Sequence, residues 1–179
     1  SSKKYFFLNE DFSIDEKLLN NFFKENKDQT FILFGFTHII WKIFNDNINL
    51  LKKYNFSNSI IIHGGGWKKL NLTGLNNIDF NKFFLNNFKI KKIFNYYGMV
   101  EQTGSIFLEC KCGNFITSKY SDIIIRDKYF NLCKDGEKGI VQLFSVLPTS
   151  YPGHIILTED EGLILEKNQC KYNNFKHFK

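Results

Sequence analysis

Two glycine-containing segments follow apolar runs that are typical of buried strands, and both carry residue types suited to nucleotide chemistry. The first is His63-Gly-Gly-Gly66. Glycines let the backbone approach a flat ligand closely, although a glycine cluster is equally typical of a plain tight turn. The second is Asn95-Tyr-Tyr-Gly98, with Glu101 shortly after it. An aromatic ring there could stack on a base, a glycine could make room for phosphate, and a carboxylate could hold Mg²⁺.

A third segment, Leu157-Thr-Glu-Asp-Glu-Gly162, places acids directly after another apolar run. An acid such as Asp160 could bind the two hydroxyls of a ribose, while the alternative is an ordinary acidic turn. An isolated acid such as Glu101 is likewise most often a plain surface residue. Ligands of open α/β sheets gather beyond the carboxyl ends of the parallel strands, which is where the first two segments are expected to lie.

The first half of the chain alternates strand and helix patterns. Apolar runs predict strands at 30–34, 59–63 and 92–97. Helical spacing predicts helices at about 14–25, after a capping box at Ser13 and Glu16, at 37–54, and behind a cap at Asp79. Continuous apolar strands in this order predict an α/β fold, with a parallel sheet covered on both faces by helices. Gly64 and Gly98 should then lie at the same edge of that sheet.

The second half is richer in short strands and turns. The expected strands cover 106–109, 121–126, 139–145, 154–157 and 163–166, separated by turn signals such as Asp135-Gly136 and Pro152-Gly153. We therefore expect one domain over residues 1–179, with an α/β part over 1–104 that runs into a β-rich part over 105–179.

Composition excludes several classes of protein. Net charge is +6, but the lysines are dispersed among acids, and Arg126 is the only arginine among 24 basic residues. Because arginine is best suited to phosphate and base contacts, a nucleic-acid partner is disfavoured. The absence of alanine and the 21 phenylalanines indicate an AT-rich coding sequence rather than a function. No stretch resembles a signal peptide or a membrane span, so the cytoplasm is the expected compartment.

The segments together resemble a known family. Tyr97-Gly-Met-Val-Glu101 is similar to the Tyr-Gly-x-Thr-Glu signature of adenylate-forming acyl ligases. A closer resemblance is to the acyl-protein synthetase (LuxE) family of bacterial bioluminescence. That resemblance rests on Tyr97-Gly-Met-Val-Glu-Gln-Thr-Gly-Ser-Ile-Phe107 and on Leu147-Pro-Thr-Ser-Tyr-Pro-Gly-His-Ile-Ile-Leu-Thr-Glu-Asp160, and it extends from about Phe31 to Gly162.

The resemblance implies ATP-dependent activation of a carboxylic acid, a long-chain fatty acid in the bioluminescence enzymes. The acyl-adenylate would pass its acyl group to a protein cysteine that serves a fatty-acid reductase, so the expected partners are the acid and an acyl-accepting or reductase protein. ATP and Mg²⁺ are the implied cofactors. Glu101 would be the catalytic residue that ligates Mg²⁺, Tyr97 would stack on adenine, and Asp160 would hold the ribose. The residues implied to bind the nucleotide are Gly64, Gly65, Gly66, Asn95, Tyr97, Gly98 and Asp160.

The chain departs from the superfamily pattern at several points. Val100 stands where the superfamily usually has threonine, and Gln102 or Thr103 could bind phosphate in its place. The expected upstream phosphate loop does not occur before Phe31, and the C-terminal hinge and small domain would follow Lys179. We therefore expect the second half of a large adenylating domain, inactive alone and at best a weak nucleotide binder.

Two alternatives remain open: a coenzyme A ligase of the phenylacetate type, and a non-catalytic remnant or binding module. The four cysteines, Cys110, Cys112, Cys133 and Cys170, also invite a zinc interpretation. Cys110 and Cys112 have a C-x-C spacing, which differs from the C-x-x-C of common zinc sites, and the other two cysteines are distant in sequence. This pattern favours buried structural thiols. Cys170 is a poor candidate for the acyl acceptor, because the family's acylated cysteine lies near the C-terminal end.

Overall fold

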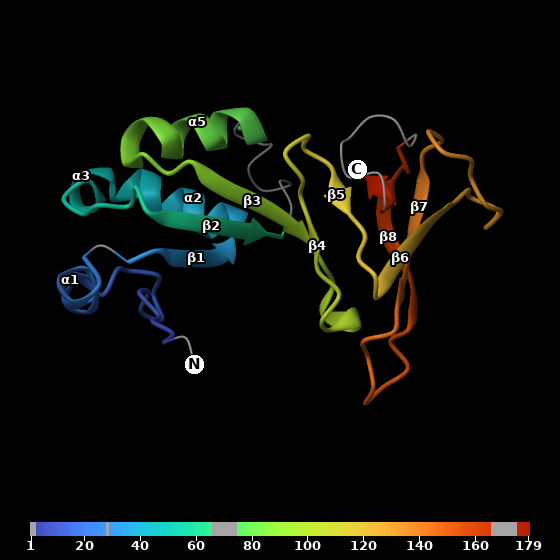
Figure 1. Cartoon of the computed structure of the whole chain (residues 1–179), viewed down its shortest axis with the longest axis horizontal. Helices are drawn as coiled ribbons and strands as arrows, with labels where there is room; N and C mark the ends of the chain where they lie inside the picture. Colours follow the sequence, from blue (N-terminus) through green and yellow to red (C-terminus); the bar gives the residue numbers. More distant parts are fainter. Residues whose placement is uncertain (1–2, 28, 66–74, 166–174) are drawn as a thin grey trace. The chain divides into compact units, whose positions relative to one another are not determined.

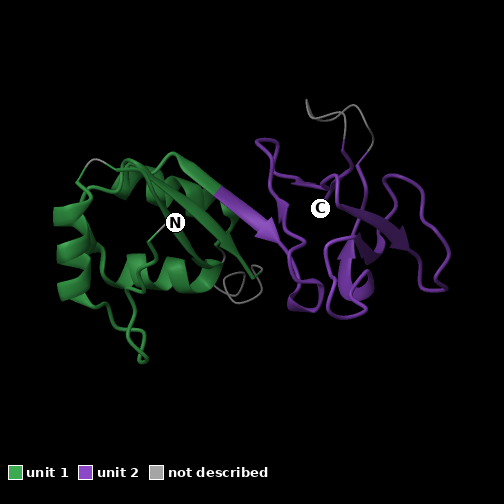
Figure 2. Ribbon diagram, turned by 60° about the horizontal axis from the view of Figure 1, so that its bottom comes forward, with its two compact units in different colours: residues 1–93 green, residues 94–179 purple. Residues whose placement is uncertain are grey.

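The structure is a computed structural model that describes residues 3–27, 29–65, 75–165 and 175–179. The chain divides into two compact units, residues 1–93 and residues 94–179 (Figures 1 and 2). The first unit is α/β and the second is rich in β-strands, which agrees with the fold class predicted from the sequence.

Helix α1 (Glu16–Glu25) begins slightly later than its sequence pattern predicts. The predicted capping box is wrong, because Asp15 is the N-cap and its carboxylate accepts the amide of Leu18 at 2.9 Å. The hydroxyl of Ser13 instead donates to the carboxylate of Asp11 at 2.6 Å. The serine hydroxyl thus hydrogen-bonds to a carboxylate two residues away, within its own turn, and does not cap the helix.

Strands β1 (Phe31–Phe36) and β2 (Ser59–Gly64) pair in parallel and in register along their whole lengths, as predicted. Strand β1 continues through Gly35 to Phe36, beyond the predicted end at residue 34. The strand lies at one end of the sheet order β1-β2-β3-β4, and a glycine keeps the backbone hydrogen bonds of a strand even though it packs no side chain.

Helix α2 (Thr37–Asp46) and the one-turn helix α3 (Ile48–Leu51) replace the single helix predicted over 37–54. The break lies at Asn47, whose side-chain and backbone amides both donate to the carbonyl of Ile43, at 2.9 and 3.1 Å. An asparagine that satisfies the terminal carbonyls in this way ends an α-helix.

Helix α5 (Asn77–Phe88) is capped by Asn76, and not by Asp79 as predicted. The side-chain oxygen of Asn76 accepts the amide of Asp79 at 3.0 Å. Asp79 therefore lies in the first turn, where its negative charge interacts favourably with the helix dipole. The helix ends at Lys89, which adopts a left-handed conformation with a φ of 60°.

Helices α1, α2 and α5 bury an aromatic-rich core against one face of β1 and β2 (Figure 1). The buried members of this core are Leu19, Ile40, Phe44, Leu51, Phe56, Ile61, Phe80, Phe84, Phe88 and Ile90. Ring pairs such as Phe44–Phe84, with centroids 5.0 Å apart, add edge-to-face contacts to the buried apolar area.

The opposite face of β1 differs from the prediction of a sheet covered on both sides. Ile32, Phe34 and Phe36 are 59%, 67% and 54% exposed, and they alternate with inward-facing residues. Among the residues that the structure describes, helices cover only one face of this part of the sheet.

Strand β3 (Lys92–Tyr97) has the predicted bounds and lies next to β2 in the sheet order. The short strand β4 (Phe107–Leu108) pairs antiparallel with the end of β3. The sheet is therefore mixed and mostly parallel. Between β3 and β4 the chain forms a single 3₁₀ turn, η1 (Val100–Gln102).

The second unit is built around an antiparallel sheet of β6 (Ser121–Arg126), β7 (Gly139–Ser145) and β8 (Ile155–Gly162). The first two strands agree residue for residue with the sequence prediction. β8 is longer than predicted, because the pairing with β7 resumes beyond an irregularity between Ile140 and Gln142.

A second pair, β5 (Phe115–Ile116) and β9 (His177–Phe178), was not predicted from the sequence. The strand predicted at 163–166 is wrong in its described part, where Ile164 makes only an isolated bridge to Phe178. The core of this unit consists of Phe107, Ile123, Ile125, Val141, Leu143, Ile164 and Phe178.

Candidate functional site

Tyr97 and Asp160 meet in the second unit, although they are far apart in the sequence. Tyr97 ends β3, Asp160 lies on β8, and the phenol of Tyr97 donates to Oδ2 of Asp160 at 2.9 Å. Burial raises the pKa of Tyr97, and the hydrogen bond and negative charge of Asp160 raise it further. The phenol therefore stays protonated, and it holds the Asp160 carboxylate in a fixed position.

The Tyr97 ring is fixed by its aromatic neighbours. Its centroid lies 6.1 Å from that of Phe107, 5.9 Å from that of Phe115 and 5.9 Å from that of Phe178. These rings come from β4, β5 and β9, so three short strands position one side chain. Packing of this kind gives the ring a single orientation at low entropic cost.

Thr158 fixes the backbone beside Asp160. Its buried hydroxyl donates to the carbonyl of Val141 at 2.8 Å and accepts the amide of Asp160 at 3.1 Å. The neighbouring acids Glu159 and Glu161 are exposed, and Glu161 forms an ion pair with Lys138 at 2.5 Å. The strand register therefore turns Asp160 toward Tyr97 and its two neighbours toward solvent.

Glu101 lies at the centre of η1 with an exposed side chain. It makes no hydrogen bond or ion pair with any residue that the structure describes. A carboxylate that is fixed to a turn and open to solvent fits a magnesium ion, which binds few protein oxygens and keeps substrate phosphates and waters as its other ligands. The donor set at Glu101 therefore fits the predicted metal.

Asn95 and Gly98 lie on either side of Tyr97. Asn95 is buried on β3, where its backbone amide donates to Oε2 of Glu109 at 3.3 Å. A Cβ atom at Gly98 would lie 3.0 Å from the carbonyl oxygen of Ser105, so only a glycine fits this turn without displacing the backbone.

Gly64 and Gly65 lie in the first unit, at the end of β2. Gly65 has a φ of +87°, and a Cβ there would lie 2.7 Å from the ring of Phe36, so the position requires glycine. Gly66, the third predicted glycine, lies outside the described residues. The predicted nucleotide residues therefore divide between the two units.

His63 precedes these glycines and is fully buried. The hydroxyl of Thr37 lies 2.9 Å from His63 Nδ1 and donates to the carbonyl of Gly64 at 2.9 Å. Since the hydroxyl has one proton, Nδ1 of His63 is the donor in the first bond. Burial lowers the pKa of His63 to about 4, so the ring is neutral at physiological pH and ties β2 to the start of α2.

Gln102 is the residue whose role the sequence did not reveal. The prediction that it could bind phosphate in place of a threonine at position 100 is wrong, because its side chain is fully buried. Its amide nitrogen donates to the carbonyl of Gly153 at 3.0 Å and lies 3.4 Å from that of His154. Thr103 is exposed, and its hydroxyl donates to the carbonyl of Val100 at 3.1 Å.

The described cysteines do not form a metal centre. Cys110 is buried with its sulfur 4.0 Å from His177 Nδ1, Cys112 is exposed, and Cys133 is partly buried. No group of three or more potential metal ligands among His, Cys, Asp and Glu occurs in the described parts of the chain. Cys170 lies outside them.

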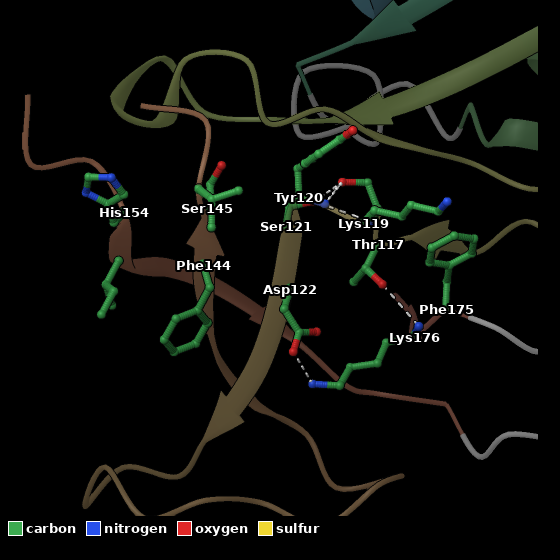
Figure 3. Close-up of a pocket in the computed structure, with 13 residues that line it drawn as sticks. Thr117, Lys119, Tyr120, Ser121, Asp122, Phe144, Ser145, His154, Phe175 and Lys176 are labelled. Carbon is green, nitrogen blue, oxygen red and sulfur yellow. Dashed lines mark hydrogen bonds and ion pairs between the residues drawn. The ribbon is translucent and has the colours of Figure 1, made fainter. Parts of the chain in front are cut away.

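A separate open cavity of about 780 Å³ lies in the second unit (Figure 3). Its lining includes Tyr120, Phe144, His154 and Lys176, and Lys176 forms an ion pair with Asp122 at 2.7 Å. None of the residues predicted to bind the nucleotide lines this cavity.

Several solved structures share the fold of this chain at low sequence identity. One is a long-chain-fatty-acid–CoA ligase (FadD1) from Archaeoglobus fulgidus, with a TM-score of 0.60 and 11% identity over 94% of this chain and 37% of that protein. Another is MatB from Rhodopseudomonas palustris, with a TM-score of 0.57 and 13% identity over 89% and 32%. MatB has also been solved with ATP bound.

The luciferase-like enzyme of the nonluminescent mealworm Zophobas morio is similar as well, with a TM-score of 0.57 and 16% identity over 86% of this chain and 40% of that protein. The chain thus spans about a third to two fifths of the length of these proteins. No curated protein matches the chain in sequence.

Residues 1–178 match the acyl-protein synthetase family, LuxE. The chain belongs to this family, which confirms the resemblance found in its motifs. No helix in the described part of the chain is long and apolar enough to cross a membrane.

Proposed function

We propose that the protein containing this chain activates a carboxylic acid with ATP and transfers the acyl group to a protein cysteine. The chain would be the second half of the large adenylating domain. The observation that carries the proposal is the hydrogen bond between Tyr97 and Asp160, in the same unit as the open carboxylate of Glu101. Membership of the acyl-protein synthetase family supports the same reaction class.

The chemistry has two steps. A carboxylate oxygen of the acid attacks the α-phosphorus of ATP, which forms the acyl-adenylate and releases pyrophosphate. A cysteine thiolate then attacks the acyl carbonyl carbon and releases AMP. Both reactions require that the two reacting groups be held in the correct orientation, which is the role of the groups that bind the nucleotide.

Asp160 is suited to binding the ribose. Oδ2 accepts the Tyr97 phenol, and Oδ1 can accept the ribose hydroxyls. Because the phenol remains protonated, it supports the charge on the carboxylate. We propose that Tyr97 also stacks on adenine, with Asn95 of the same strand along the edge of the base. Gly64, Gly65 and Gly66 are proposed as further nucleotide-binding residues.

Glu101 would hold Mg²⁺, which when bound neutralises charge on the phosphates as pyrophosphate leaves. The carboxylate is suited to this because no described residue competes for it. Gly98 contributes indirectly, since its close approach to Ser105 sets the turn that leads to Glu101.

The acid is proposed to be a fatty acid and the acceptor a protein thiol, as the resemblance of the motifs implies. The family description, acyl-protein synthetase, supports transfer of an acyl group to a protein. The supply of ATP and reduced thiols favours the cytoplasm as the compartment. A comparison of a long-chain fatty acid with short and aromatic acids as substrates, and of an acceptor protein with coenzyme A, tests these assignments.

The metal assignment is tested by acid-dependent exchange of pyrophosphate into ATP in the full-length protein. Glu101→Gln should lower the exchange rate by on the order of 10²–10³, since it removes the charge that holds the metal against the phosphates. Glu159→Gln is the matched control, because Glu159 is also an exposed acid but has no proposed contact with the metal. Equal rates in the two variants would remove Glu101 from the site.

A further inference from the structure

The segments 97–104 and 147–160 lie against each other along their lengths in the second unit. Tyr97 bonds to Asp160, and Gln102 bonds to Gly153. Thr103 bonds to Tyr151, and a Cβ on Gly104 would lie 3.7 Å from Leu147. From residue 97 to residue 104 the partner residue moves back from 160 to 147, so the two segments run antiparallel. The contacts near Tyr97 belong to the nucleotide site, whereas those of residues 102–104 have no part in it.

The turn η1 cannot hold its position by itself. It is a single 3₁₀ turn of three residues, a length at which backbone hydrogen bonds give little stability. Val100 is 86% exposed and Glu101 is also exposed, so neither side chain anchors the turn. Gln102, at 0% exposure, is its only buried side chain.

The partners of Gln102 are two backbone carbonyls, those of Gly153 and His154. Because both are acceptors, they orient the amide of Gln102 with its nitrogen toward them. The carbonyl of His154 also accepts the amide of Ser145, at the end of β7, at 2.8 Å. The three-stranded sheet is therefore connected to η1 through residues 153 and 154.

Tyr151 makes a second connection from the same loop. Its phenol oxygen accepts the backbone amide of Thr103 at 2.7 Å, just beyond η1. The ring lies over Gly153 so closely that a Cβ at that position would overlap it. Glycine at 153 is thus required for Tyr151 to reach Thr103.

We propose that loop 151–154 is a clamp that sets the position of Glu101, with Gln102 and Tyr151 as positioning residues for its carboxylate. This inference rests on the proposed function of Glu101 as the magnesium ligand. In this proposal Gln102 and Tyr151 bind neither the metal nor the nucleotide; they act by connecting the backbone of residues 102 and 103 to loop 151–154.

The test measures ATP binding to the full-length protein by calorimetry, without the acid substrate, in excess Mg²⁺ and again in a chelator. The ratio of the two affinities reports the metal contact without any turnover. Tyr151→Phe should lower this ratio about three- to ten-fold, the range expected for removal of one hydrogen bond, and leave ATP affinity in the chelator within about two-fold of the wild type. Gln102→Met should lower the ratio on the order of ten-fold or more, because it also leaves the Gly153 carbonyl unsatisfied.

Tyr129→Phe is the matched control, since Tyr129 is 71% exposed and remote in sequence from both segments, and its ratio should equal that of the wild type. Because Tyr151 is 37% exposed, Tyr151→Phe is expected to fold. This variant therefore tests the clamp even if Gln102→Met does not fold. A wild-type ratio in Tyr151→Phe, or an equal loss of ATP affinity with and without Mg²⁺, overturns the clamp. Glu101→Gln separates the two proposals: if it leaves the ratio unchanged, the metal assignment itself fails.

Discussion

Asp160 stands between two acids of the same strand, and the three have different surroundings. Asp160 accepts the phenol of Tyr97, whereas Glu159 and Glu161 are exposed. A carboxylate that accepts ribose hydroxyls makes charge-assisted hydrogen bonds, worth about 1.5–3 kcal/mol. The surroundings therefore single out one acid of the three.

Asp160→Ala should accordingly weaken ATP binding about 10- to 100-fold, whereas Glu159→Ala and Glu161→Ala should change it less than about three-fold. Titration of the three variants of the full-length protein with ATP measures this difference. A larger loss at Glu159 than at Asp160, or equal affinities throughout, would show that the ribose contact lies elsewhere.

His63 gives the molecule a specific dependence on pH. Its pKa is lowered by burial from 6.5 to about 4 in the folded protein. Above pH 6.5 the ring is neutral in both the folded and the unfolded state. Between pH 6.5 and 4 the unfolded chain takes up a proton that the folded protein does not, so the folded state loses stability as the pH falls.

The free energy of unfolding should therefore decrease between pH 6.5 and 4, with a contribution from His63 on the order of 3 kcal/mol. Urea denaturation of the wild type and of His63→Asn at several pH values checks this. The variant is expected to be less stable near neutral pH but to show a flatter profile over this range. Parallel profiles would mean that His63 is not the titrating group.

At the scale of elements, three strands were predicted in full, whereas helix ends and the strand at 163–166 were not. Strands 92–97, 121–126 and 139–145 were predicted residue for residue, because a buried apolar run between turn residues has few alternative structures. The caps of α1 and α5 were missed because several carboxylates and amides compete for the same few backbone groups, and a difference of about 1 kcal/mol decides among them.

The contrast between Asp15 and Ser13 can be measured. Asp15→Ala should lower the free energy of unfolding by about 1 kcal/mol, since it removes the side chain that caps α1. Ser13→Ala should cost less than about 0.5 kcal/mol, because the serine hydroxyl bonds only within the exposed turn before the helix. Chemical denaturation of both variants tests the assignment, which the reverse order of effects would contradict.

The clamp on η1 could not be predicted from sequence patterns. Gln102 bonds to backbone carbonyls about fifty residues away, and a carbonyl carries no signature of residue type. The proximity of Tyr97 and Asp160 was expected only because their motifs resemble those of a family, since no periodicity connects β3 with β8. Residue types indicated the chemistry, and long-range contacts determine which groups can perform it.

At the scale of the whole molecule, the fold class and family were both predicted, while the exposed apolar face of β1 was not. An apolar run in the sequence predicts a strand that is buried on both faces. The run looks the same whether or not a second layer of helices covers the other face of the sheet. The chain spans about a third to two fifths of the length of the solved proteins whose fold it shares, so the proposed activity is tested on the full-length protein.

The central claim is that the acid attacks the α-phosphorus of ATP, and oxygen tracing tests it most directly. The full-length protein is supplied with ATP, Mg²⁺, an acceptor thiol and a fatty acid whose carboxylate carries ¹⁸O, and AMP is then analysed by mass spectrometry. Attack by the acid followed by thiol transfer leaves one carboxylate oxygen on the phosphate, so each AMP should carry one ¹⁸O. Unlabelled AMP, or ADP with the label in inorganic phosphate, would contradict the proposed adenylation.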